Sequence, residues 1–146
     1  MKKNIVFIGG GIETYPGIEI CKKRNYKIIL VDGNKNCYCK PSADYFIHAS
    51  TYDYKSIVEK LKKKILSKIK IDAVLSLGVD VPLSVAYVAR KVGCKSIPLK
   101  TAQICSDKLE FKKKIIKSRI PTSKYFIIRK EKDLKKISFK KFVLKP

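Results

Sequence analysis

The chain has 146 residues, which is the size of one domain with a short extension. Its apolar fraction of 45% is enough for one hydrophobic core, and its apolar runs are too short to span a membrane. The formal net charge is +22, but only four of the 34 basic residues are arginine, the side chain best suited to reading bases and phosphates. We therefore expect a cytoplasmic protein, and neither a membrane nor a nucleic acid as its partner.

The first 99 residues alternate apolar strands with amphipathic helices. Five strands are predicted, over residues 5–8, 27–31, 45–48, 73–77 and 95–97. Three helices are predicted between them: one capped by Thr14 that ends near Arg24 and buries Ile18, Ile20 and Cys21, one over 54–69 and one over 81–92. This order predicts an α/β fold, with a Rossmann-like open parallel sheet of about five strands and helices on both faces.

The pattern changes after Pro98. Short helices are predicted over 100–106 and from Asp107 onward, followed by strands over 125–128 and 141–144 on either side of a small helix at 131–136. We interpret residues 1–99 as the Rossmann-like domain, and residues 100–146 as linker helices that lead into a small β-α-β extension.

The residue types used in nucleophilic catalysis and metal binding give no pattern. Five cysteines with irregular spacing favour free thiols over disulfides or a zinc site. His48 is the only histidine, and no nucleophile signature surrounds it. We assign no catalytic residue and no metal ligand.

Glycines and acidic residues follow the predicted strands along one edge of the sheet. Gly9, Gly10 and Gly11 follow the first strand, Asp32 the second and Asp80 the fourth. Ligands of open parallel sheets bind beyond the carboxyl ends of the strands, and glycines let them approach the backbone. We interpret these five residues as substrate-binding. The alternative is that the glycines only make a tight turn, while Asp32 caps a loop and Asp80 caps the next helix.

The same edge bears on a dinucleotide-binding function. Asp32 stands 21 residues after Gly11, near the position of the acidic residue that holds a ribose in dinucleotide-binding folds. Thr14, however, occupies the position where the third glycine of that fingerprint belongs. The dinucleotide pattern is therefore only partly present.

Two lysines stand at the ends of predicted elements. Lys108 lies in the first turn of a helix, where a cation opposes the helix dipole unless it serves another purpose. Lys145 lies at the tip of the last strand. Each is either a phosphate contact or an ordinary solvated lysine.

Three short motifs follow one another in the last third of the chain. They are Ser106-Asp107-Lys108 with Phe111 following, Ile120-Pro121-Thr122, and Phe142-Val143-Leu144-Lys145-Pro146. In this order they resemble the motifs at the entry to the ATP-grasp domain of the ATP-grasp superfamily, which includes biotin carboxylase, carbamoyl phosphate synthase and the purine and amino-acid ligases. The opening strand and glycine turn of the chain resemble the α/β domain that precedes the ATP-grasp domain. The chain departs from the pattern at Arg119, where the family often has glycine, and at Ser123, which replaces a proline.

The resemblance implies roles for the residues singled out above. Lys108 and Lys145 would contact the phosphates of ATP, and the glycine turn and Asp80 would face a small-molecule carboxylate or acyl substrate. ATP phosphorylates that carboxylate with the help of Mg²⁺, and an amine then displaces the phosphate. The subfamily looks closest to carboxylate–amine ligases and carbamoyl-phosphate-synthase-like proteins.

The resemblance stops before the glycine-rich lid, the adenine-binding segment and the acidic magnesium ligands. We therefore expect the front portion of a ligase that is inactive alone, with a continuing frame or a second chain to supply the rest. Two other functions stay open. A stand-alone nucleotide- or dinucleotide-binding domain would continue the main sheet through residues 100–146, and a basic module for nucleic acid would bind with a steep dependence on salt.

Overall fold

The structure is a computed structural model that describes residues 2–67, 69–138 and 141–144. The chain forms two compact units, Met1–Lys112 and Lys113–Pro146. These units are compact parts of the structure. The predicted domain boundary between residues 1–99 and 100–146 is a different kind of division, and it stays a prediction.

The first unit is built on a parallel sheet whose two central strands have continuous apolar runs, residues 5–8 and 28–31. The strands are β1 (Asn4–Ile8), β2 (Lys27–Asp32), β3 (Tyr45–His48) and β4 (Ala73–Leu75). Their order is β3-β2-β1-β4, and Val6 at the centre of β1 pairs with Ile29 on one side and Val74 on the other. Continuous apolar strands need cover on both faces, which is the arrangement that parallel sheets have.

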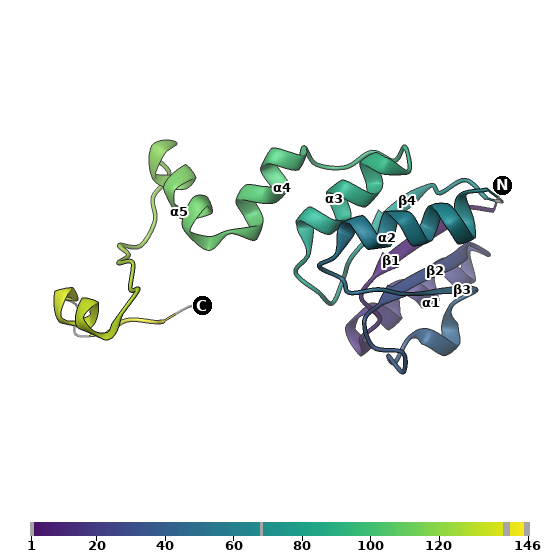
Figure 1. Cartoon of the computed structure of the whole chain (residues 1–146), viewed down its shortest axis with the longest axis horizontal. Helices are drawn as coiled ribbons and strands as arrows, with labels where there is room; N and C mark the ends of the chain where they lie inside the picture. The colour runs from purple at the N-terminus through teal and green to yellow at the C-terminus, as the bar shows by residue number, and fades with distance from the viewer. Residues whose placement is uncertain (1, 68, 139–140, 145–146) are drawn as a thin grey trace. The chain divides into compact units, whose positions relative to one another are not determined.

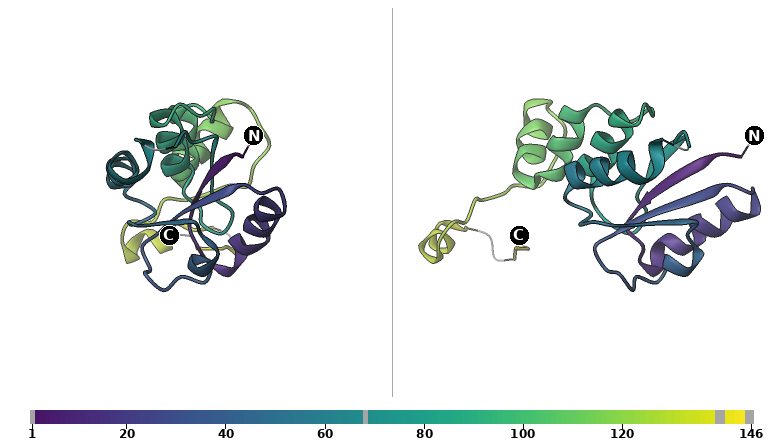
Figure 2. Two further views of the ribbon diagram at one scale, coloured as in Figure 1. Left: turned by 90° about the vertical axis from the view of Figure 1, so that its right-hand side faces the viewer. Right: turned by 45° about the vertical axis from the view of Figure 1, so that its right-hand side comes forward.

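Helices cover both faces of this sheet (Figure 1). The helix α1 (Tyr15–Lys23) packs on one face through Ile18. The helices α2 (Tyr54–Leu61) and α3 (Pro82–Lys91) cover the opposite face, as the two views of Figure 2 show. The predicted doubly covered α/β sheet is confirmed.

The helix predicted over 54–69 is present but not uniform. Asp53 caps α2 by accepting a hydrogen bond from the Ser56 amide at 3.0 Å. After Leu61 the chain continues as a π-helix, Lys62–Leu66, which still points Ile65 into the core. The apolar spacing predicted the buried side but not this change of helix type.

Two details of the predicted first domain are wrong. Residues 95–97 form no strand, so the sheet has four strands in the part of the chain that is described. Ile97 is the only apolar residue of that run and is half-exposed, so the run has little apolar surface with which to join the sheet. Ile20 lies on the outer side of α1 and is 55% exposed. The helix at 100–106 is confirmed as α4 (Leu99–Ser106), which packs against α3.

The second unit contains less regular structure than predicted. The helix α5 (Lys108–Lys117) crosses the division between the units, and a 3₁₀-helix spans Glu131–Lys136. The strands predicted over 125–128 and 141–144 are absent, so the β-α-β extension is not formed among the described residues. The apolar residues of these two runs are largely exposed. Apolar side chains that stay exposed bury little surface, so neither run gains what favours a strand in a packed sheet.

Asp133 organises the 3₁₀-helix of the second unit. Its carboxylate accepts hydrogen bonds from the Lys136 ammonium at 3.0 Å and from the Arg129 amide at 3.2 Å. These contacts, with Lys136 first, hold the pKa of Asp133 below its ordinary value.

Candidate functional site at the carboxyl edge of the sheet

The glycine turn after β1 begins with a residue that only glycine suits. Gly9 has φ +95°, a backbone conformation that L side chains rarely adopt. A Cβ atom at this position would lie 2.5 Å from Val79 Cγ2, in the loop that follows β4. The Gly9 amide donates to the Val31 carbonyl at 2.8 Å, which continues the β1–β2 pairing into the turn. The turn is therefore packed between its two neighbours in the sheet.

Asp32 fixes the second glycine. The Gly10 amide donates to Asp32 Oδ2 at 2.6 Å, and the Asn34 amide donates to Oδ1 at 2.7 Å. Hydrogen bonds to an ionised group are among the stronger ones in proteins. A Cβ atom at Gly10 would lie 2.7 Å from Cys37 Sγ, so glycine is required here for space. Asp32 thus ties together the loops after β1 and β2; its predicted contact with substrate stays a prediction.

The carbonyl groups of the turn are held from behind by two side chains that sequence reasoning did not assign to the site. The Thr14 hydroxyl donates to the Gly9 carbonyl at 3.0 Å, and the Cys39 thiol donates to the Gly11 carbonyl at 3.1 Å. The prediction that the Thr14 side chain caps α1 is therefore wrong, because its hydroxyl donates to the Gly9 carbonyl instead. The Gly9 and Gly10 amides are used as well, by the Val31 carbonyl and by Asp32, so, within the part of the chain that the structure describes, the Gly11 amide is the one of the three glycine amides that is left for a ligand.

Two cysteines form the floor beneath the turn. Cys37 and Cys39 are both buried, and the Cys39 amide also donates to the Gly10 carbonyl at 2.9 Å. Burial raises the pKa of both thiols, and the nearby Asp32 carboxylate raises it further. All five cysteines are free, as predicted, and these two act as small packing groups.

The loop after β4 touches the glycine turn. A Cβ atom at Gly78 would lie 3.1 Å from Glu13 Cβ, and one at Gly11 would lie 2.6 Å from Glu13 Oε2. The Glu13 side chain therefore lies where the two loops meet, although no sequence pattern marked it. Since β2 and β4 lie on opposite sides of β1, this meeting point is where the strand order reverses. Ligands of open α/β sheets bind at such a point.

Asp80 lies at the same edge with its side chain exposed. The N-cap of α3 is Val81, and no side chain caps that helix. The prediction that Asp80 acts as a helix cap is therefore wrong. The loop around it is held instead by the Ser76 hydroxyl, which donates to the Val79 carbonyl at 2.6 Å. The predicted contact of Asp80 with substrate stays a prediction.

Of the two lysines predicted to contact phosphate, Lys108 lies among the described residues and Lys145 does not. Lys108 is exposed in the first turn of α5, as predicted. Asp107 caps the helix start, with Oδ1 accepting from the Leu109 amide at 2.8 Å and the Glu110 amide at 3.0 Å. Lys145 lies outside the described residues. The roles of both lysines toward ATP stay predictions.

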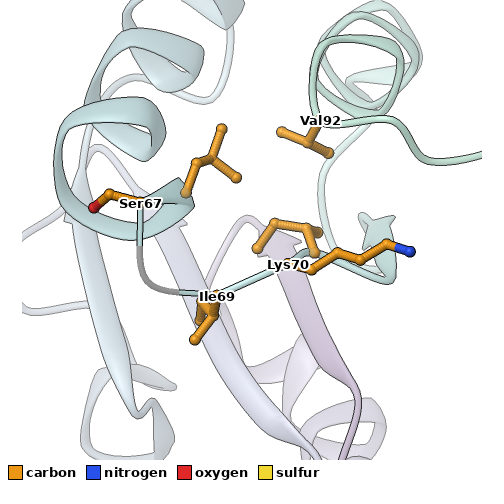
Figure 3. A pocket seen from close by; sticks show the side chains of 6 residues that line it. Ser67, Ile69, Lys70 and Val92 are labelled. Carbon is orange, nitrogen blue, oxygen red and sulfur yellow. The ribbon is translucent and has the colours of Figure 1, made fainter.

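Two hollows lie in the first unit, at opposite ends of the sheet. A hollow of about 420 Å³ lies near the amino end of β4, where Ser67, Ile69, Lys70 and Val92 surround it (Figure 3). Its lining is mostly aliphatic, with no carboxylate. A cleft of about 510 Å³ lies at the carboxyl ends of β2 and β3 and includes Asp32. Of these two hollows, the one at the carboxyl edge is therefore the one whose lining includes carboxylates.

Two findings concern membrane spans and metal ligands in the described part of the chain. No helix there is long and apolar enough to cross a membrane. No group of three histidine, cysteine, aspartate or glutamate side chains there could hold a metal ion. The Mg²⁺ implied by the family resemblance therefore has no set of ligands among these residues, and we assign it none.

Comparison with known proteins shows which solved structures share this fold. No protein-family model and no curated protein matches the chain. Among solved structures, phosphoribosylglycinamide synthetase from Anaerococcus prevotii superposes with a TM-score of 0.73 at 20% identity, over 93% of this chain and 34% of that one. The fold is that of the first part of ATP-grasp enzymes.

Two further structures support the ATP-grasp fold. N5-carboxyaminoimidazole ribonucleotide synthetase from Thermotoga maritima matches with a TM-score of 0.67 at 23% identity, over 94% of this chain and 37% of that one. L-amino acid ligase from Bacillus licheniformis matches with a TM-score of 0.71 at 17% identity, over 94% and 36%. The chain thus spans about a third of the length of these ATP-grasp enzymes, and the resemblance predicted from its motifs is confirmed at the level of the fold.

Proposed function

We propose that this chain is the opening part of an ATP-grasp ligase, and that the meeting point of the loops after β1 and β4 is its substrate-binding edge. The observation that carries the proposal is the contact among Gly11, Glu13 and Gly78 at the reversal of strand order, in a fold shared with ATP-grasp enzymes. The proposed localisation is cytoplasmic.

The reaction proposed for the whole enzyme has two steps. A carboxylate oxygen of the substrate attacks the γ-phosphorus of ATP, the bond from that phosphorus to the β,γ-bridging oxygen breaks, and ADP leaves. An amine nitrogen then attacks the acyl carbon, inorganic phosphate leaves, and the nitrogen loses a proton. Mg²⁺ would neutralise charge on the phosphates when bound.

Within this reaction the first unit would bind and orient the substrate. The Gly11 amide of the glycine turn suits an anionic group of the substrate. Glu13 stands beside the turn, and Asp80 is exposed in the loop after β4, so the end of the substrate that faces these two acids is expected to be neutral or positively charged. A substrate with both a carboxylate and an ammonium group, such as an amino acid, fits this pairing.

The ATP-binding part of the proposal rests on Lys108 and Lys145 and on a lobe beyond the residues that the fold comparison covers. Each ammonium group would lie against phosphate oxygens as a point charge. We expect the chain alone to give no steady turnover of ATP with added amino acids. Sustained release of phosphate that depends on an added amino acid would contradict this expectation.

Substrate binding to the edge can be tested without ATP. The melting temperature of the full chain is measured with each amino acid and with simple carboxylic acids. At least one compound is expected to stabilise the chain, by about 2.7 kcal/mol at 100 times its Kd. The effect should be lost in Asp80→Asn and kept in Glu59→Gln, which changes an exposed acid on α2. A panel without any stabilising compound, or equal loss in both variants, would count against the proposal.

A further inference from the structure

The cleft at the carboxyl ends of β2 and β3 is separate from the substrate edge proposed above. Its residues come from the turn after β2, the loop after β3 and the first turns of α2, with one side chain from the loop after β4. They are Asp32, Gly33, His48, Ala49, Ser50, Thr51, Tyr52, Asp53, Ser56, Lys60 and Val79. A volume of about 510 Å³ is in the range of sites that hold small organic molecules.

Some polar groups of the cleft already have hydrogen-bond partners within the protein, and the groups that do not are the ones a ligand could bind. His48 Nε2 lies 3.0 Å from the Gly33 carbonyl, which can only accept, so Nε2 carries the proton. In the neutral ring, Nδ1 is then an acceptor. The Lys60 ammonium donates to the His48 carbonyl at 2.7 Å. One carboxylate oxygen of Asp53 caps α2. These contacts hold the walls of the cleft in place.

Asp32 keeps capacity for a ligand with two hydroxyl groups. A carboxylate has about four accepting positions, and the Gly10 and Asn34 amides use one on each oxygen. One position on each oxygen is left, and the side chain lines the cleft. A vicinal diol can donate one hydrogen bond to each of these positions. An acidic residue at the end of the second strand holds a ribose in this way in related sheets.

Tyr52 supplies an aromatic surface beside Asp32. It is 70% exposed, lies in the loop that lines the cleft, and has its amide held by the Ser50 hydroxyl at 3.3 Å. An exposed aromatic ring is a stacking surface for a flat heterocycle. Ser50, Thr51 and Ser56 add hydroxyl groups that can either donate or accept.

We propose that this cleft binds a ribonucleoside group, with its 2′,3′-diol on the Asp32 carboxylate and its base stacked on Tyr52. The site uses mainly the end of β2 and the loop after β3 and shares only Val79 with the loop after β4, whereas the proposed substrate edge uses the loops after β1 and β4. The two proposals can therefore fail independently.

The test is a titration of the full ¹⁵N-labelled chain with adenosine and with 2′-deoxyadenosine, followed by amide chemical shifts. Adenosine is expected to shift the amides of residues 32–34 and 48–56. 2′-Deoxyadenosine should bind about tenfold more weakly, because one hydrogen bond to a carboxylate is lost. Equal affinity for the two compounds, no binding of adenosine at millimolar concentration, or shifts confined to residues 9–13 and 76–80 would overturn the proposal.

Matched variants test the stacking surface. Tyr52→Ala should weaken adenosine binding about tenfold, and Tyr52→Phe should keep it, because the ring is what stacks. Tyr38→Ala is the control, since Tyr38 is 57% exposed and does not line the cleft. Unchanged affinity in Tyr52→Ala, or an equal loss in Tyr38→Ala, would contradict the assignment. Tyr52 is exposed, so its removal is not expected to unfold the chain.

Discussion

Replacing Gly9 with alanine tests whether the glycine turn is wedged against the loop after β4. Two costs are expected. The backbone cost of a side chain at φ +95° is about 1–2 kcal/mol. The Cβ atom would also lie 2.5 Å from Val79 Cγ2, and overpacking of this kind costs about 1–3 kcal/mol. We expect Gly9→Ala to lower the free energy of unfolding by about 2–5 kcal/mol.

Gly93→Ala is the matched control, because it has the backbone cost without the packing cost. Gly93 has φ +78°, and a Cβ atom there would meet nothing within 4 Å. Urea unfolding followed by far-UV circular dichroism gives both free energies, and their difference should be about 1–3 kcal/mol. Adding Val79→Ala to Gly9→Ala should remove most of that difference. Equal destabilisation by Gly9→Ala and Gly93→Ala, or no recovery with Val79→Ala, would refute the contact between the two loops.

Three other predictions concern the groups around the edge and the second unit. Asp32→Asn should lower the free energy of unfolding in urea by about 1.5–3 kcal/mol, because the Gly10 and Asn34 amides lose the carboxylate that they share. Asp80→Asn is the control and should change that free energy little. Equal effects of the two variants would contradict the role of Asp32 in the loop. The raised pKa values of the Cys37 and Cys39 thiols mean that their contribution to stability is full below the unfolded thiol pKa and is lost as pH rises through the folded values. The urea midpoint should therefore fall in mildly alkaline solution, and a thiol reagent at neutral pH should modify the exposed Cys105 first; early modification of Cys39 would count against its burial. Because the pKa of Asp133 is lowered, its carboxylate stabilises the 3₁₀-helix at pH values above the ordinary pKa of 3.8, and this contribution is lost as pH falls through the pKa of the folded state. In an NMR titration, Lys136→Met should raise the pKa of Asp133, and Lys135→Met should not.

The sequence predicted the sheet well because its signals are local and strong. Continuous apolar runs such as residues 5–8 and 27–31 can be satisfied only in a sheet covered on both faces, and the helices between them have one apolar side. The rule that ligands bind beyond the carboxyl ends of parallel strands then placed the glycines and Asp32 at one edge, and the structure bears out that placement.

The details of the edge depend on contacts between residues far apart in the chain, which no local pattern carries. The Cys39 thiol donates a hydrogen bond to the Gly11 carbonyl, 28 residues away in the sequence. The Glu13 side chain lies next to Gly78, in the loop after β4. The signal for Thr14 was misread, because threonine before a helix is usually a cap, whereas its hydroxyl turns back to Gly9. A reader of the sequence could have noticed only that Cys37 and Cys39 are small apolar residues in a loop that otherwise looks polar.

The second unit shows the limit of reading strands from composition. Residues 125–128 are apolar and rich in strand-forming types, which favoured a strand. A strand, however, is defined by backbone pairing between two segments, and residues 125–128 do not have strand conformation in the structure. Local composition describes only one of the two segments that a strand pair needs.

The central claim is that the meeting point of the loops after β1 and β4 binds the substrate. Its most direct test is to titrate the ¹⁵N-labelled full chain with the compound that most raises the melting temperature and to map the amide shifts. We predict shifts confined to residues 9–13 and 76–80. Shifts that fall on the lysine-rich outer sides of the helices, or that leave the glycine turn unchanged at saturation, would contradict the claim.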